Sequence, residues 1–169
     1  LIMVLVRIAD SARCLPVAAT RGRPRTRDAT RYGLRTESEF DAAHFLTDYH
    51  GKCENLHGHR WRVVAYLEVD ELQKEGTCKD MVVDFGDFKG ALRALTEQLD
   101  HRFIVEEGSL AADTLACLER EGFTLFMMPF RVTAENLARW FFDRLAERGL
   151  PVSQVDVYET PANCAIYRR

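Results

Sequence analysis

The chain has 169 residues, of which 47% are hydrophobic and 29% charged, values typical of one soluble globular domain. No apolar run reaches the ~20 residues needed to cross a bilayer, so no membrane partner is expected. The formal net charge of −3 divides into +6 for residues 1–35 and −9 for the remainder, and an acidic body gives no electrostatic reason to bind nucleic acid.

Residues 1–35 differ from the rest of the chain. They hold eight arginines against Asp10 and Asp28, and they show no hydrophobic period. A secretory signal would carry its positive charge before the apolar run over residues 1–8, whereas an Arg-rich, acid-poor leader also fits a mitochondrial transit peptide. We predict a disordered or non-native extension over 1–35 and one domain over 36–169. The five scattered cysteines, without a CxxC pair, favour a reducing cytoplasm.

Alternation of apolar and polar residues predicts two strands in the first half of the domain. In the segment 40–46, the residues Phe40, Ala42, His44 and Leu46 alternate with their neighbours. In 57–69, the odd-numbered residues from His57 onward are histidine or apolar, and the even-numbered ones are mostly polar. The histidines of the second strand therefore share a face with its apolar residues.

Helical spacing follows, and then two more strands. Apolar residues spaced by three and four predict a helix over 84–99, and Thr133 can cap a second helix that ends near Gly149. Between them, 109–120 fits a short extra helix and 123–128 a short extra strand. The segments 152–158 and 162–167 fit two closing strands. The predicted fold class is α+β, with the main order ββααββ: an antiparallel sheet with two helices on one face, and a second face that an oligomeric β-barrel would cover.

Four of the five histidines lie within residues 44–59; His50 falls in a polar loop, and the other three, His44, His57 and His59, are the candidate cluster. Neutral imidazoles are the commonest zinc ligands, and three protein ligands with one open position are typical of a catalytic zinc site. Zinc is favoured over iron or copper, although imidazole ligands alone do not exclude the other two. A lone core histidine is usually a packing residue, but a cluster on neighbouring strands predicts a metal site.

Four further residues are candidates for chemistry. Cys53 could be a fourth zinc ligand, a reactive thiol or a small buried hydrophobe. In Asp100-His101, a carboxylate can orient the adjacent imidazole, although such pairs are common by chance. Glu159, near the end of an apolar strand, is a candidate binding carboxylate or an ordinary charge at a strand end.

Several motifs together resemble the family of 6-pyruvoyltetrahydropterin and 6-carboxytetrahydropterin synthases, and they run through most of the chain after Phe40. A Cys-x-x-x-His-Gly-His run behind Phe-x-Ala-x-His is specific, and further motifs follow it in order. The matching segments are Phe40–His44, Cys53–His59, Val83–Phe85, Leu99–His101, Thr133–Ala138 and Tyr158–Thr160.

The resemblance implies a tunnelling fold (T-fold), in which a homo-oligomer, with a hexamer favoured, builds a β-barrel with active sites between subunits. It also implies residue roles. The three clustered histidines would hold Zn²⁺, and Cys53 would be the catalytic base in a relay with Asp100 and His101. Glu159 would bind the pterin ring through two oxygens that match two adjacent N–H donors.

The implied substrate is 7,8-dihydroneopterin triphosphate. Cleavage of its side chain would give 6-carboxy-5,6,7,8-tetrahydropterin, acetaldehyde and triphosphate, as in the bacterial enzyme of queuosine (7-deazaguanine) biosynthesis. Elimination of triphosphate without that cleavage would give the 6-pyruvoyl product instead. A third possibility is a non-enzymatic zinc protein in which Cys53 is the fourth ligand. A zinc hydrolase is disfavoured, because no His-Glu-x-x-His helix is present.

Overall fold

The computed structural model describes residues 31–169. Its first strand begins at Tyr32, inside the segment that the sequence assigned to an extension. The remainder of that prediction falls on residues 1–30, outside the described part, and the boundary between extension and domain stays a prediction.

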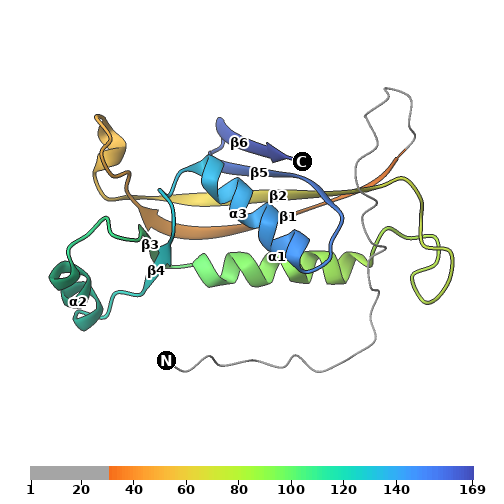
Figure 1. Cartoon of the computed structure of the whole chain (residues 1–169), viewed down its shortest axis with the longest axis horizontal. Helices are drawn as coiled ribbons and strands as arrows, with labels where there is room; N and C mark the ends of the chain where they lie inside the picture. Colours follow the sequence, from red (N-terminus) through yellow and green to blue (C-terminus); the bar gives the residue numbers. More distant parts are fainter. Residues whose placement is uncertain (1–30) are drawn as a thin grey trace.

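Six strands and three α-helices follow one another along the described chain (Figure 1). The predicted short helix and strand between the two main helices are both present. In chain order the elements are β1 (Tyr32–His44), the 3-10 turn η1 (Lys52–Glu54), β2 (His57–Val69), α1 (Phe85–Leu99), β3 (Arg102–Glu106), α2 (Ala112–Arg120), β4 (Leu125–Met128), α3 (Ala134–Glu147), β5 (Val152–Thr160) and β6 (Asn163–Arg168).

The strands form one curled, mixed sheet in the order β4-β3-β1-β2-β5-β6. The expectation of a purely antiparallel sheet was wrong, because β3 pairs with β1 in parallel and β4 pairs with β3 in parallel. The cause is the helical connection in each case: α1 lies between β2 and β3, α2 lies between β3 and β4, and parallel neighbours need such a crossover. The β1–β2, β2–β5 and β5–β6 pairs are antiparallel, as expected.

Both main helices begin at capping residues that satisfy free backbone N–H groups. The carboxylate of Asp84 accepts hydrogen bonds from the N–H groups of Gly86 and Asp87 at the start of α1. The hydroxyl of Thr133 accepts one from Asn136 N–H at the start of α3, which confirms the predicted cap. The two helices therefore start where the sequence indicates.

Helices α1 and α3 lie against one face of the sheet and bury its apolar residues (Figure 1). Phe40 of β1 stacks on Trp61 of β2 with ring centroids 6.1 Å apart, and Phe141 of α3 packs on Phe40 at 6.0 Å. His44 lies on the same face and is fully buried. The histidine end of β1 and β2 therefore continues directly from the core.

The opposite face of the sheet, which we call the open face, is polar. Arg62 of β2 pairs with Glu37 of β1 at 3.4 Å and lies over the ring of Tyr158 at 3.8 Å. Asp156 of β5 also lies on this face and is only 4% exposed. Its exposed side chains are mainly charged, although Ile166 of β6, opposite Asp156, is 54% exposed. Unburied apolar surface is therefore only a small part of any argument for the predicted oligomeric barrel.

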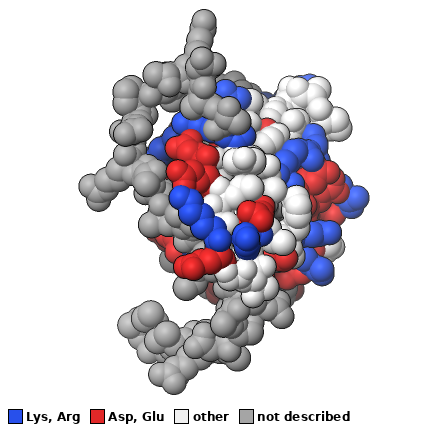
Figure 2. All heavy atoms as spheres, turned by 90° about the vertical axis from the view of Figure 1, so that its right-hand side faces the viewer, with Lys and Arg blue, Asp and Glu red and all other residues white. Residues whose placement is uncertain are grey.

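None of the helices within residues 31–169 is long and apolar enough to cross a membrane. Acidic and basic side chains are interspersed on the end of the molecule that Figure 2 shows, without a large region of one sign in its described part.

Replacement of Phe141 by alanine should destabilise the protein strongly, because the ring is fully buried between α3 and the sheet. We expect the free energy of unfolding to fall by about 3–5 kcal/mol, measured by urea titration. The matched control is Phe85→Ala, since that ring is 61% exposed, and its effect should be much smaller. Equal losses for the two variants would contradict this description of the core.

Candidate active site

Three imidazoles converge at one end of the β1–β2 pair. The antiparallel register places His44 opposite His57 and Ala42 opposite His59. Strand alternation directs all three rings to the helix-covered face, with centroids 4.5–5.3 Å apart. His57 and His59 share this face with the apolar residues of β2, as predicted. The ring of the core residue Trp61 packs edge-on against the imidazoles of His44 and His59.

The histidine tautomers follow from their neighbours. Nδ1 of His44 lies 2.8 Å from the carbonyl oxygen of Val132, and Nδ1 of His57 lies 2.7 Å from that of Asn55. A carbonyl oxygen only accepts, so in the neutral ring Nδ1 carries the hydrogen and Nε2 presents a lone pair. These carbonyl contacts are the kind that orient metal-binding histidines.

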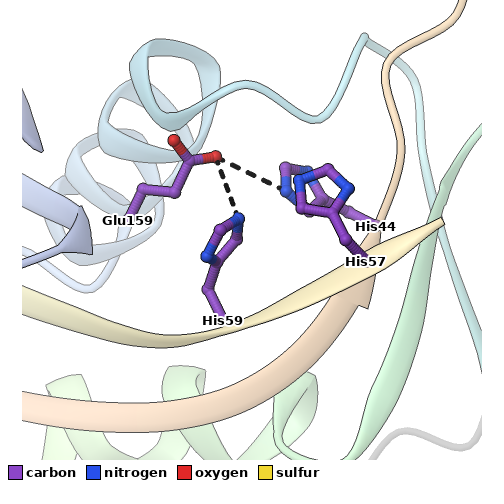
Figure 3. Close-up of side chains that lie close together, drawn as sticks. All are labelled: His44, His57, His59 and Glu159. Atoms are coloured by element: carbon purple, nitrogen blue, oxygen red, sulfur yellow. Dashed lines mark ion pairs between the residues drawn. The ribbon is translucent and has the colours of Figure 1, made fainter. Parts of the chain in front are cut away.

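The three Nε2 atoms have no hydrogen-bond partner, although all three are buried. The carboxylate of Glu159 joins them: its Oε1 lies 3.5 Å from Nε2 of both His44 and His59 (Figure 3). One ligand atom from each of the four residues lies within 4.8 Å of the others. Lone pairs and a carboxylate that face the same point repel one another unless a cation lies between them, so the geometry fits a bound metal ion.

Burial favours the neutral form of His44 and His59, which is the form that binds metal. Loss of solvent is the main reason that the pKa of His44 is lowered from 6.5 to about 4, and the two neighbouring imidazoles add to this effect. Burial also lowers the pKa of His59, and the nearby Glu159 opposes that shift. A neutral imidazole is the ligand form, so His44 is ready to bind a cation at neutral pH without losing a proton.

Cys53 lies in η1, outside the four-residue metal group. The backbone N–H of Leu46 donates to the carbonyl of Cys53 at 2.8 Å, which ties this turn to the chain just after β1. Cys53 and Glu159 line the same cavity of about 390 Å³, together with polar groups of the segment before α3. The structure thus places the thiol with the carboxylate at a cavity large enough for part of a small ligand.

Asp100 and His101 form the predicted pair, with Asp100 Oδ2 3.1 Å from His101 Nδ1. The backbone of Asp41 holds them: its N–H donates to Asp100 Oδ1 at 2.8 Å, and its carbonyl accepts from His101 N–H at 2.7 Å. The first of these bonds is the main reason that the pKa of Asp100 is lowered. His101 adopts a φ of +55°, a conformation that costs a non-glycine residue about 1 kcal/mol or more.

Asp100 and His101 do not lie at the cavity that Cys53 and Glu159 line. His101 lines a second cavity, of about 560 Å³, whose lining includes Asp41 and Arg60 of the open-face side and also His59 of β2. Its side chain is 79% exposed. The three histidines, in contrast, lie on the helix-covered face. One chain therefore places Cys53 and Glu159 at one cavity, and it places His101, next to Asp100, at another.

Sequence reasoning missed several contributors to these sites. Glu159 was expected near a ligand and not within the metal group itself. The carbonyls of Val132 and Asn55 carry no residue-type signal, because any residue supplies a carbonyl. Asp41 supports Asp100 and His101 through its backbone, and its side chain is engaged by Arg60, whose hydrogen bonds lower the pKa of the Asp41 carboxyl.

Comparison with known proteins gives one consistent family. The model of the family described as 6-pyruvoyl tetrahydropterin synthase matches residues 33–169. A 6-carboxy-5,6,7,8-tetrahydropterin synthase of Haemophilus influenzae is 35% identical over 140 residues, which cover 81% of this chain and 99% of the relative.

Solved structures agree on the fold. An uncharacterized protein from Wolinella succinogenes has a TM-score of 0.70 at 25% identity, over 83% of this chain and 99% of the other. A 6-pyruvoyltetrahydropterin synthase of Plasmodium vivax, in a variant with a catalytic residue replaced, has a TM-score of 0.62 at 22% identity, over 83% and 98% of the two chains. The curled six-stranded sheet with three helices is the fold of these structures.

The metal-free protein should lose stability as the pH falls from 6.5 towards 4. In that window His44 takes up a proton in the unfolded chain but not in the folded one, so protons favour unfolding. The full effect is about 3 kcal/mol of unfolding free energy, from a pKa lowered to about 4. Urea titrations at several pH values measure it.

Replacement of His44 by asparagine should flatten this dependence of stability on pH. Replacement of His50 by glutamine is the matched control, because His50 is exposed, and it should leave the dependence close to that of the parent protein. A pH dependence that is identical in the His44 variant and the parent would show that the buried imidazole is not its source.

Proposed function

Because this chain belongs to the 6-pyruvoyl tetrahydropterin synthase family, we propose that it is a 6-carboxy-5,6,7,8-tetrahydropterin synthase, a carbon–carbon lyase of 7-deazaguanine (queuosine) biosynthesis. The Haemophilus relative with 35% identity has this name. The observation that carries the proposal is the convergence of three unpartnered imidazole nitrogens and one carboxylate beside a cavity that contains a thiol.

The substrate of the proposed reaction is 7,8-dihydroneopterin triphosphate. With one water consumed, its atoms balance as 6-carboxy-5,6,7,8-tetrahydropterin, acetaldehyde and triphosphate. Such a reaction breaks a side-chain carbon–carbon bond and releases the triphosphate, so it needs groups that hold the side-chain hydroxyls and groups that move protons. The chain offers both kinds.

His44, His57 and His59 would hold the metal, and we assign it as Zn²⁺ because nitrogen-rich ligand sets with a carboxylate suit that ion. A bound zinc ion supplies Lewis acidity to the side-chain hydroxyls of the substrate. The chain's own part is to hold the imidazoles of His44 and His57 in fixed orientation, through the carbonyls of Val132 and Asn55.

Cys53 and Glu159 would act on opposite parts of the substrate. Cys53, in the cavity next to the cluster, would take up protons at the side chain as a thiolate. Glu159 would bind the guanidine-like edge of the pterin through its two oxygens, as the family resemblance implies. Their common cavity supports this division, because one bound pterin could touch both.

Asp100 and His101 would complete the site of a second copy of the chain. They are not among the residues that line the cavity of Cys53 and Glu159 in their own chain, and the side chain of His101 is exposed. The sheet also ends in two strands, β4 and β6, that each have one free edge in the described part of the chain. A homo-oligomeric barrel, with a hexamer favoured by the resemblance, would cover these edges and bring the two half-sites together.

Elimination of triphosphate to the 6-pyruvoyl product is the second candidate function, because the family model is described by that activity. Product analysis separates the two. Purified protein given 7,8-dihydroneopterin triphosphate should release acetaldehyde and form the 6-carboxy product, detected by mass spectrometry. Formation of the 6-pyruvoyl product without acetaldehyde would refute the first assignment in favour of the second.

Replacement of Cys53 by alanine should abolish turnover and leave the metal content unchanged, because Cys53 lies outside the metal group. Replacement of His57 by alanine should remove both metal and turnover. Elemental analysis together with the product assay measures the two properties. Loss of metal from the Cys53 variant would instead favour a structural zinc site with Cys53 as the fourth ligand.

Mixing two inactive variants tests whether one active site uses two chains. His57→Ala lacks the metal half-site and His101→Ala lacks the proton-transfer half-site, so each alone should be inactive. When the two are unfolded together and refolded at equal amounts, about a quarter of the interfaces should combine two intact halves and regain activity. No recovery from the mixture, with full recovery of refolded parent protein, would place all catalytic groups of a site in one chain.

A further inference from the structure

Glu159 stands where a fourth metal ligand would stand. Its Oε1 is 3.5 Å from Nε2 of both His44 and His59, and the Figure 3 view shows it facing the imidazoles from β5. Metal–ligand bonds of about 2.0–2.2 Å at tetrahedral angles place neighbouring ligand atoms about 3.3–3.5 Å apart. The observed separations match this spacing.

No arginine or lysine within residues 31–169 pairs with the Glu159 carboxylate, whose only ion-pair contacts are with the two histidines. The tautomer of His44 leaves Nε2 as an acceptor that faces Oε1. Two acceptors that face each other need positive charge between them, and a separation of 3.5 Å is longer than a normal hydrogen bond through a shared proton but fits a shared metal ion. The carboxylate and the imidazoles are therefore arranged to share one metal ion.

The backbone at Glu159 is suited to a side chain that changes direction. The β5–β6 register shifts between Tyr158 and Thr160, so Glu159 lies at an irregularity of the ladder and has no paired residue in β6. The last β2–β5 pair is Arg62 with Tyr158, one residue earlier. Irregularities of this kind redirect a side chain next to an active site. The side chain of Glu159 is 27% exposed against 1% for His44, so it is the more accessible of the two.

We infer that Glu159 is an exchangeable metal ligand, which binds the metal in the substrate-free protein and leaves it for the pterin ring when substrate enters. The second half rests on the proposed function, since it is that function which gives the pterin to this carboxylate. The exchange would open the fourth metal position only when a pterin is bound. Binding of the pterin ring by Glu159 would then be coupled to access of the substrate's own side chain to the metal.

Cobalt substitution tests the ligand assignment without any measurement of activity. Co²⁺ takes the place of the resident metal, and its visible absorption reports the number and kind of ligands. Replacement of Glu159 by glutamine should weaken Co²⁺ binding by about 10- to 100-fold in competition with a chelator and should change the spectrum. Glu135→Gln is the matched control, because Glu135 lines the same cavity but is not in the metal group, and it should change affinity less than about twofold.

The exchange is tested on the parent protein with a dihydropterin that lacks the phosphorylated side chain. Saturation with this compound should change the Co²⁺ spectrum of the parent protein, and the same addition should leave the spectrum of Glu159→Gln unchanged. Circular dichroism of both variants verifies that they are folded.

The possible failures are distinguishable. Unchanged Co²⁺ affinity in Glu159→Gln overturns the ligand assignment. A constant parent spectrum at saturating pterin overturns the exchange. A parent protein that binds no pterin at all overturns the exchange too, and it counts against the proposed function, while the affinity comparison still decides whether Glu159 is a ligand.

Discussion

The register between β1 and β2 is the constraint on which the site depends. It sets His44 opposite His57 and Ala42 opposite His59 at the end of a long antiparallel pair. A slip of one residue would send the side chains of one strand to the other face, separating its histidines from the others and removing its apolar residues from the core. The packing of Phe40 and Trp61 under α3 therefore fixes the positions of the three histidines as well as the fold.

The two faces of the sheet carry different kinds of side chain. The helix-covered face carries the core and, at its end, the three imidazoles, and burial lowers the pKa of His44 and of His59. The open face carries paired charges and the side of β1 that holds Asp100 and His101. A single chain therefore places Cys53 and Glu159 at one cavity and His101 at another, and this arrangement supports the proposal of a site assembled between copies.

Much of this could be predicted from local patterns, and the remainder could not for identifiable reasons. Alternation in 57–69 correctly gave the face of His57 and His59, and the cap at Thr133 correctly gave the start of α3. The strand β3 was missed because it is only five residues long and follows α1 almost at once. The parallel pairing of β3 and β4 was not foreseen, since it depends on the crossovers and not on alternation. The approach of Glu159 to the imidazoles depends on the pairing of β5 with β2, which no spacing along the chain encodes.

The backbone of Asp41 links two functions that the fold otherwise keeps apart. It lies three residues before His44 on the same strand, and it holds Asp100 and His101 through both of its peptide groups. If copies share active sites, each β1 strand contributes to two of them. His44 would be a metal ligand in one site, and Asp41 would hold the Asp100–His101 pair of the next. A substitution at this strand would then alter two neighbouring sites at once.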